Sequence, residues 1–253
     1  MRAPLNALIT GAARGIGLAA VRLLLEEGWQ VALLDRDADA LHEAAATLGD
    51  NVRVLVCDIS DEDAVSALAA AWEGPLNALV NNAGVADFGP IEETDFQRWR
   101  RVMATNLDGT FLMSQAFTPA LKRGAAEGLA SICNVASISG LRASTLRVAY
   151  GTSKAAVVHL TQQQAVELGE YGVRANAVAP GPVDTKLALA VHTPAIRAAY
   201  HDAIPLNRYG QENEIAEAIR FLVSPRASYV TGQLLCADGG FEATGIGLPS
   251  LRG

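Results

Sequence analysis

The sequence predicts an α/β fold, in which helices cover both faces of a doubly wound parallel sheet of about seven strands. Segments rich in Ala and Leu separate most of its short apolar runs, as strands and helices alternate in such folds. Glycine or polar residues follow several of the runs, which places ligand-binding groups at the carboxyl edge of the sheet. The predicted strands are residues 5–10, 30–34, 52–57, 76–80, 129–135, 172–178 and 233–236.

Composition favours one domain over residues 1–253 and excludes several classes of partner. Half of the 253 residues are apolar, which is enough for one large core. Acidic residues outnumber basic ones by 27 to 20, and no Lys/Arg-rich run could follow a nucleic acid. The apolar runs have strand length, so we expect no membrane partner. The first residues lead directly into a strand pattern without a leader, so we expect a cytoplasmic protein.

Cysteine and histidine usage predicts chemistry without a metal. Cys57, Cys133 and Cys236 are far apart and lie in or at the ends of apolar runs, as buried free thiols of a reducing compartment would. The sequence contains no C-x-x-C or H-E-x-x-H motif, and its four histidines lack the spacing of ligands. A zinc-dependent alcohol dehydrogenase is therefore disfavoured.

A glycine-rich turn joins the first predicted strand to a helix that ends near Gly28. Gly11, Gly15 and Gly17 have the spacing G-x-x-x-G-x-G. Gly11 allows the turn, while Gly15 and Gly17 allow the backbone to approach a pyrophosphate. The helix would present free N–H groups and the positive end of its dipole to that anion.

Carboxylates and amides follow the next three strands. Asp35 ends the second strand, where a carboxylate can receive ribose hydroxyls, and Asp37 could cap the next helix in its place. Asp58 follows the third strand, and its alternative role is also helix capping, although Ser60 or Asp61 could do this. The fourth strand ends in the sequence Asn-Asn-Ala-Gly at residues 81–84, whose amides can bond neighbouring backbone and form the floor of a site.

Tyr150, Lys154 and Ser137 are the candidate catalytic residues. A helix over residues 149–171 places Tyr150 and Lys154 on one face, where the ammonium would lower the pKa of the phenol. Ser137 follows a buried strand and would lie at the carboxyl edge of the sheet. Alone, Y-x-x-x-K is more typical of a solvated pair on a helix surface. The accompanying glycine turn, Asp35 and the Asn-Asn-Ala-Gly motif favour a catalytic site.

Together these motifs resemble the short-chain dehydrogenase/reductase family in its compact form, from about Leu5 to Gly240. The resemblance implies a Rossmann-type fold and reversible hydride transfer between a nicotinamide and a small-molecule secondary alcohol or ketone. It implies that Ser137 binds the reacting oxygen, that Tyr150 exchanges its proton, and that Lys154 lowers the tyrosine pKa and holds the nicotinamide ribose. Asn106 would be a fourth catalytic residue, holding a water linked to Lys154.

The resemblance also implies a set of cofactor contacts, with Asp58 near the adenine and a turn after the sixth strand at the nicotinamide. We expect NAD rather than NADP, because Asp35 would repel the additional phosphate. Arg14 and Arg36 argue in the other direction, since NADP-using relatives often carry a base at these positions. The implied contacts are Gly11, Arg14, Gly15, Ile16, Gly17, Asp35, Arg36, Asp58, Ile59, Asn82, Ala83, Gly84, Tyr150, Lys154, Pro180, Gly181, Val183 and Thr185.

Three further expectations concern the surroundings of the site. Residues 186–208 have weak periodicity and mixed polarity, which predicts an irregular substrate lid and favours a small polar alcohol such as a polyol. Residues 241–253 contain several apolar side chains, and we expect them to be ordered and to shape a substrate pocket, either of the same subunit or of a neighbouring one; the alternative is a frayed terminus. Small residues on the Asn106 and Tyr150 helices, together with the resemblance, predict a homotetramer.

Three alternatives remain at this point. A 3-oxoacyl-carrier-protein reductase using NADPH would share the fold, but residues 85–90 do not resemble that subgroup and no basic patch for an acidic carrier is evident. A non-catalytic nucleotide-sensing protein would have no use for Ser137, Tyr150, Lys154 and Asn106 together. An epimerase or dehydratase of the longer branch would add a C-terminal domain, whereas about a dozen residues follow Gly240 here.

Overall fold

A computed structural model describes residues 4–185 and 192–245, and it confirms the predicted fold class. Seven strands form one sheet in the order β3-β2-β1-β4-β5-β6-β7, and every neighbouring pair is parallel. Chain order reverses between β1 and β4, the arrangement of a doubly wound sheet with a ligand crevice at its carboxyl edge. The strands are β1 (Asn6–Thr10), β2 (Gln30–Asp35), β3 (Val52–Val56), β4 (Ala78–Asn81), β5 (Ala130–Val135), β6 (Val173–Pro180) and β7 (Leu234–Ala237).

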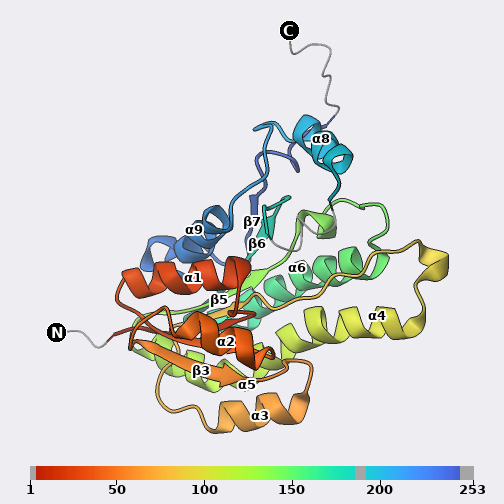
Figure 1. The fold of residues 1–253 in the computed structure, drawn as a ribbon. Helices are drawn as coiled ribbons and strands as arrows, with labels where there is room; N and C mark the ends of the chain where they lie inside the picture. The colour runs from red at the N-terminus through yellow and green to blue at the C-terminus, as the bar shows by residue number, and fades with distance from the viewer. Residues whose placement is uncertain (1–3, 186–191, 246–253) are drawn as a thin grey trace.

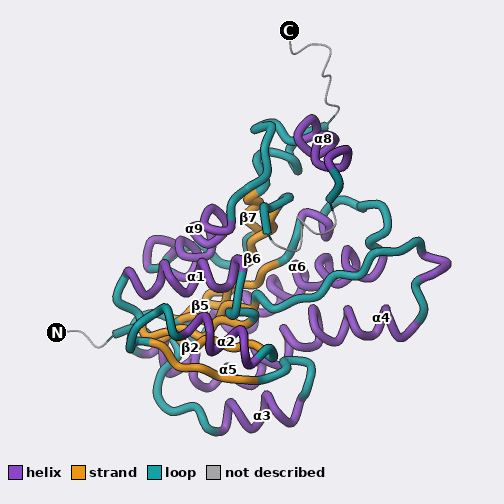
Figure 2. Tube along the Cα trace, in the orientation of Figure 1, coloured by secondary structure: helices purple, strands orange, loops and turns teal. Residues whose placement is uncertain are grey.

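Helices cover both faces of this sheet (Figures 1 and 2). One apolar cluster joins β1 and β2 to α1, α2 and α9, and it includes Ile9, Leu24 and Leu33. A second cluster on the other face joins the same strands to α3, α5 and α6, and it includes Leu8 and Phe117. Successive strand residues enter opposite clusters because strand side chains alternate between faces. The helices are α1 (Gly15–Glu26), α2 (Ala38–Ala45), α3 (Glu62–Ala70), α4 (Phe96–Met103), α5 (Gly109–Ala126), α6 (Val148–Gly169), α8 (Pro194–Ala203) and α9 (Glu212–Val223).

Helix caps settle the competing roles of the acidic residues. Asp37 accepts a hydrogen bond from the Ala40 amide at 3.2 Å and begins α2. Asp61 likewise accepts from the Ala64 amide at 3.0 Å and begins α3. Each satisfies an N–H group that has no partner within its helix. Asp35 and Asp58 are therefore not the capping residues.

The region predicted to be an irregular lid contains a helix that the sequence analysis did not predict. Thr193 caps α8 through the Ile196 amide at 3.3 Å, and Pro194 occupies a first-turn position that suits its fixed backbone. In Figure 1, α8 stands beyond the carboxyl ends of the strands. Residues 186–191 of the expected lid lie outside the described residues.

Only the first part of the predicted tail is described. Phe241 contacts Tyr200 of α8 with ring centroids 6.1 Å apart, and Arg142 pairs with Glu242 at 2.9 Å. Residues 246–253 lie outside the described residues, so the prediction for the rest of the tail is untested. Among the helices in the described ranges, none has the length and apolar character that crossing a membrane requires.

Candidate active site

Two adjoining pockets open at the carboxyl edge of the sheet. The first, here called the catalytic pocket, is lined by Ser137, Tyr150 and Lys154 among others. The second, here called the nucleotide pocket, is lined by residues from the ends of β1, β2 and β3, including Asp35 and Asp58. Residues of the Asn-Asn-Ala-Gly motif line both pockets. The order of the strands therefore brings together motifs that lie far apart in the sequence.

Ser137 and Tyr150 face the catalytic pocket from consecutive elements. Ser137 follows β5 and is buried, and its Oγ accepts a hydrogen bond from the Ser139 amide at 3.1 Å. This bond fixes the hydroxyl at the start of the 3₁₀ turn η3 (Ile138–Gly140). Burial raises the pKa of Tyr150, whereas its hydrogen bond with Ser137 and the positive charge of Arg147 lower it.

Lys154 lies one turn further along α6 and is buried. Its Nζ donates to the Val135 carbonyl at 2.7 Å and lies 5.9 Å from the Tyr150 ring centroid. Burial lowers the pKa of Lys154 to about 8, because a charged ammonium is disfavoured away from water. The groups that lower the pKa of Tyr150 in this structure are Ser137 and Arg147, while the Lys154 ammonium donates to a carbonyl, so the expected effect of Lys154 on the phenol stays a prediction.

Asn106 interrupts a helix, as its sequence context predicted. It lies in the π-helical turn η2 (Ala104–Asp108), which joins α4 to α5. Its side chain accepts from the Val85 amide at 2.8 Å and donates to the Val85 carbonyl and to Ser153 Oγ, both at 3.0 Å. A Cβ added to Gly84 would lie 3.3 Å from Asn106 Oδ1 and 3.4 Å from Lys154 Nζ. Asn106 and Lys154 therefore meet at the same glycine.

The glycine turn has the backbone that a pyrophosphate site requires. Gly11 and Gly15 adopt φ of +64° and +63°, in the left-handed region that favours glycine. The α1 N-terminus has no side-chain cap and no acidic residue in its first turn, so its positive end stays available to an anion. Gly17 has a different role from the predicted approach: a Cβ there would lie 2.2 Å from the Gly11 carbonyl oxygen, so Gly17 allows the turn to pack on α1.

The Asn-Asn-Ala-Gly motif bonds neighbouring backbone, as its sequence predicted. Asn82 Nδ2 donates to the carbonyl oxygens of Thr10 and Gly11, each at 3.0 Å. In return, Thr10 Oγ1 accepts from the amides of Asn82 and Ala83 at 3.0 Å. These bonds fix the end of β4 to the start of the glycine turn. Asn81 is buried and bonds Ser114 and Asn134 instead.

Four charged residues of the nucleotide pocket form two ion pairs, and a fifth, Asp35, bonds backbone amides. Asp35 accepts from the amides of Ala13 at 3.2 Å and Asp37 at 3.1 Å, so it also supports the glycine turn. Arg14 pairs with Asp37, and Arg36 with Asp58 at 3.4 Å. Each of the two arginines that could receive an additional phosphate thus has a carboxylate beside it.

The remaining predicted contacts divide between the two pockets. Asp58 accepts from the amide and hydroxyl of Ser60 at 3.0 and 2.7 Å, while the Ile59 side chain is buried against Gly109. Ile59 lines the nucleotide pocket, but its side chain also belongs to the core. The contacts that line the catalytic pocket are Ile16, Asn82, Gly84, Tyr150, Lys154, Pro180, Gly181, Val183 and Thr185.

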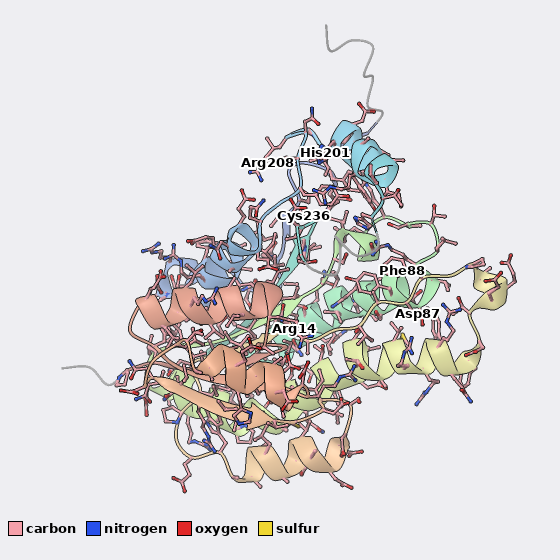
Figure 3. All side chains as sticks on the ribbon, viewed as in Figure 1. Arg14, Asp87, Phe88, His201, Arg208 and Cys236 are labelled. Carbon is pink, nitrogen blue, oxygen red and sulfur yellow. The ribbon has the colours of Figure 1, made fainter. Side chains whose placement is uncertain are left out.

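Several lining residues escaped the sequence analysis. Arg147 and Phe88 line the catalytic pocket, as do His192 and Tyr200 from the lid region. In Figure 3, Phe88 and Asp87 lie on the loop beside α4 and α6, and His201 and Arg208 lie beyond the sheet near α8. Arg147 precedes Tyr150 by three residues, which on a helix is a signal of proximity. No sequence signal placed the lid residues, because the path of the lid was not predictable.

Comparisons with known proteins agree with this arrangement. The profile of a family described as enoyl-(acyl carrier protein) reductase matches residues 11–242. Galactitol 2-dehydrogenase (L-tagatose-forming) of Cereibacter sphaeroides is 43% identical over 241 residues, covering 93% of this chain and 94% of that protein. Cis-4-hydroxycyclohexanecarboxylate dehydrogenase of Sinomonas cyclohexanicum is 41% identical over 244 residues, covering 94% and 96%. A solved structure titled short chain dehydrogenase/reductase family protein is 37% identical, covers 95% and 98%, and superimposes with a TM-score of 0.87.

Proposed function

We propose that this protein oxidises a secondary alcohol with NAD. The premise is that the chain belongs to the short-chain dehydrogenase/reductase family and is an oxidoreductase acting on CH–OH groups. The observation that carries the proposal is the meeting of two pockets at one sheet edge. One pocket has Ser137, Tyr150 and Lys154, and the other has an uncapped helix N-terminus and Asp35. The reverse reaction, reduction of the ketone, uses the same groups.

The chain's own residues supply binding and proton transfer, while the nicotinamide supplies the hydride-accepting carbon. Ser137 holds the reacting oxygen in a fixed direction, since its hydroxyl is fixed by the Ser139 amide. Tyr150 takes the proton of the alcohol during oxidation and returns it during reduction. Lys154 carries its own proton at neutral pH, because its pKa of about 8 lies above that pH, and it holds the ribose of the cofactor.

A proton route away from the phenol runs toward Asn106. Lys154 and Asn106 meet at Gly84, where a water held by the amide can link them. Asn106 also fixes the backbone of Val85 at the wall of the pocket. The contacts of Asn106 thus support the proposed relay, and they also give it a structural role.

NAD is the proposed cofactor because the nucleotide pocket holds no unpaired cation among its described residues. Arg14 and Arg36 pair with Asp37 and Asp58, and Asp35 presents a carboxylate where ribose hydroxyls would bind. An additional phosphate would meet these carboxylates as like charges.

The substrate class is proposed from the family and from two relatives that act on secondary alcohols of different polarity, galactitol and cis-4-hydroxycyclohexanecarboxylate. Polyols are therefore among the alcohols that should be assayed as substrates. A cytoplasmic homotetramer is proposed from the family and from the small residues on the Asn106 and Tyr150 helices. Light scattering that gives a monomer mass at micromolar protein would refute this assembly. The described part of the tail, residues 241–245, is proposed to help close the catalytic pocket, because Phe241 contacts Tyr200, which lines that pocket.

The test is a steady-state assay of a panel of secondary alcohols with NAD and with NADP. We expect nicotinamide reduction with at least one alcohol and a higher kcat/KM for NAD. Higher kcat/KM with NADP would overturn the cofactor assignment. An absence of hydride transfer in either direction, with intact cofactor binding by calorimetry, would favour a nucleotide-sensing protein.

A further inference from the structure

The catalytic pocket is lined by cations without a carboxylate. Arg147 and Lys154 line it, and none of its lining residues is Asp or Glu. Lys154 is engaged with the Val135 carbonyl and belongs to the proposed catalytic group. Arg147 forms no ion pair with any carboxylate in residues 4–185 and 192–245. The segments outside those residues contain no Asp or Glu. Arg147 is thus a cation without a side-chain counterion.

Other arginines near the pocket differ from Arg147 in this respect. Arg142 pairs with Glu242 at 2.9 Å, and Arg197 pairs with Asp184 at 2.7 Å. The charge of those two groups is therefore largely cancelled by a neighbour, while the charge of Arg147 is free to act on the pocket.

The backbone fixes Arg147 beside the catalytic phenol. Its Cζ lies 5.6 Å from the Tyr150 ring centroid and 4.6 Å from that of Phe88. The Gly89 amide donates to the Leu146 carbonyl at 3.1 Å, and Gly89 also forms a β-bridge with Arg147. Arg147 is half-buried. The loop of Phe88 thus stabilises an arginine that faces the cavity from the start of α6.

Two further features make this corner positive. The α6 helix begins after Arg147 without a side-chain cap and without an acidic residue in its first turn, so its positive dipole end is uncompensated there. Burial, and after it the positive charge of Arg147, also lowers the pKa of His192, which lines the same pocket. A neutral or cationic substrate would not compensate this positive charge.

We infer that the substrate is a secondary alcohol that carries a compact oxyanion, a carboxylate or a sulfonate, and that Arg147 binds this group while Ser137 and Tyr150 hold the hydroxyl. The guanidinium offers a planar pair of donors that matches such an anion. Its place beside the phenol sets the distance between the two ends of the substrate. This inference rests on the proposed function and assigns Arg147 as its specificity-determining residue.

Matched substrates separate charge recognition from a general effect on catalysis. The probes are 4-hydroxycyclohexanecarboxylate, the corresponding sulfonate, and the neutral 4-hydroxycyclohexanecarboxamide. We expect the wild type to have at least about tenfold higher kcat/KM for one of the anions than for the amide. Arg147→Met should lower kcat for anion and amide alike, because the charge of Arg147 also lowers the pKa of Tyr150, but it should raise KM about tenfold or more for the anion only. Arg147→Lys should retain part of the preference.

A surface arginine supplies the control. Arg22 is exposed on α1 and lines neither pocket, so Arg22→Met removes one positive charge without touching the site. We expect unchanged constants for all three probes. A similar loss for the anions in both variants would attribute the effect to net charge and overturn the inference.

Three outcomes identify which proposal fails. If Arg147→Met lowers kcat for anion and amide equally and leaves both KM values unchanged, Arg147 acts only on Tyr150 and the anion site is wrong. If the wild type prefers the neutral alcohol, the anion site is wrong and the proposed function stands. If no alcohol is oxidised, the proposed function fails, and a binding readout still decides the anion site. Cyclohexanecarboxylate with NADH should then raise the melting temperature of the wild type and not of Arg147→Met; equal shifts would overturn the site.

Discussion

The two pockets at the carboxyl edge differ in whether their charged groups are buried or exposed to water. In the catalytic pocket, Lys154 and Ser137 are buried, and burial moves the pKa values of both Tyr150 and Lys154. In the nucleotide pocket, the ion pairs of Arg14 with Asp37 and of Arg36 with Asp58 are exposed to water. Exposed pairs contribute little energy, whereas buried groups interact strongly because water does not screen them. We therefore expect changes in the first pocket to alter rate, and changes in the second to alter cofactor preference.

The largest expected effect is in the catalytic pocket. Tyr150→Phe removes the proton-transferring hydroxyl and leaves the ring, so kcat should fall by at least about a thousandfold. The dissociation constant of NADH, measured by fluorescence titration, should change by less than about threefold. Turnover within a few fold of the wild type would contradict the assigned role of the phenol.

Lys154→Met should reduce kcat nearly as much, and it also tests burial through stability. The folded pKa of Lys154 is about 8, against 10.5 for the ordinary group, so the unfolded chain binds more protons between these pH values. Wild-type stability should therefore rise relative to the variant from pH 8 to 10.5, by at most about 3 kcal/mol. Denaturant unfolding without cofactor, at pH 7 and pH 10, measures this difference.

A stability difference between wild type and Lys154→Met that stays constant with pH would contradict the buried ammonium. The Met side chain keeps the apolar stem of lysine, so a loss of packing does not explain a pH-dependent change.

The nucleotide pocket should respond in cofactor preference. Asp35→Ser removes the carboxylate that would repel an additional phosphate, so the ratio of kcat/KM for NAD to that for NADP should fall about tenfold or more. Because Asp35 also accepts from the Ala13 amide, part of the NAD activity should be lost. An unchanged ratio in steady-state assays would show that selection lies elsewhere.

The smallest expected effect comes from the neighbouring carboxylate. Asp37→Asn keeps a side chain that can cap α2 but removes the partner charge of Arg14. The Michaelis constant for NADP should fall a few fold, while the melting temperature stays within a few degrees. A change in the alcohol constants would contradict the separation of the two pockets.

Much of the make-up of the two pockets could be predicted from the sequence, because the motifs that form them are short and continuous. A strand followed by glycines and a helix predicts the phosphate turn. Asp37 and Asp61 were named as possible helix caps, and both are caps in the structure. Asn106 was expected to disturb a helix, and a π turn lies there.

The features that were not predicted depend on tertiary contacts. The direction of Lys154 Nζ depends on the Val135 carbonyl, which lies on β5 and accepts its hydrogen bond. The role of Gly17 depends on how closely α1 packs on the glycine turn. Arg147 stands out only because the other arginines near the pocket have carboxylates beside them, and spacing along a sequence does not reveal such pairing.

The most direct test of the account follows an isotope from the alcohol to the nicotinamide. A secondary alcohol that the enzyme oxidises, deuterated at its carbinol carbon, is incubated with enzyme and NAD, and the nicotinamide product is analysed by mass spectrometry. The account predicts one deuterium in each reduced nicotinamide, together with an equal amount of ketone. Reduced nicotinamide without deuterium, or ketone formed without reduced nicotinamide, would contradict direct hydride transfer between the two pockets.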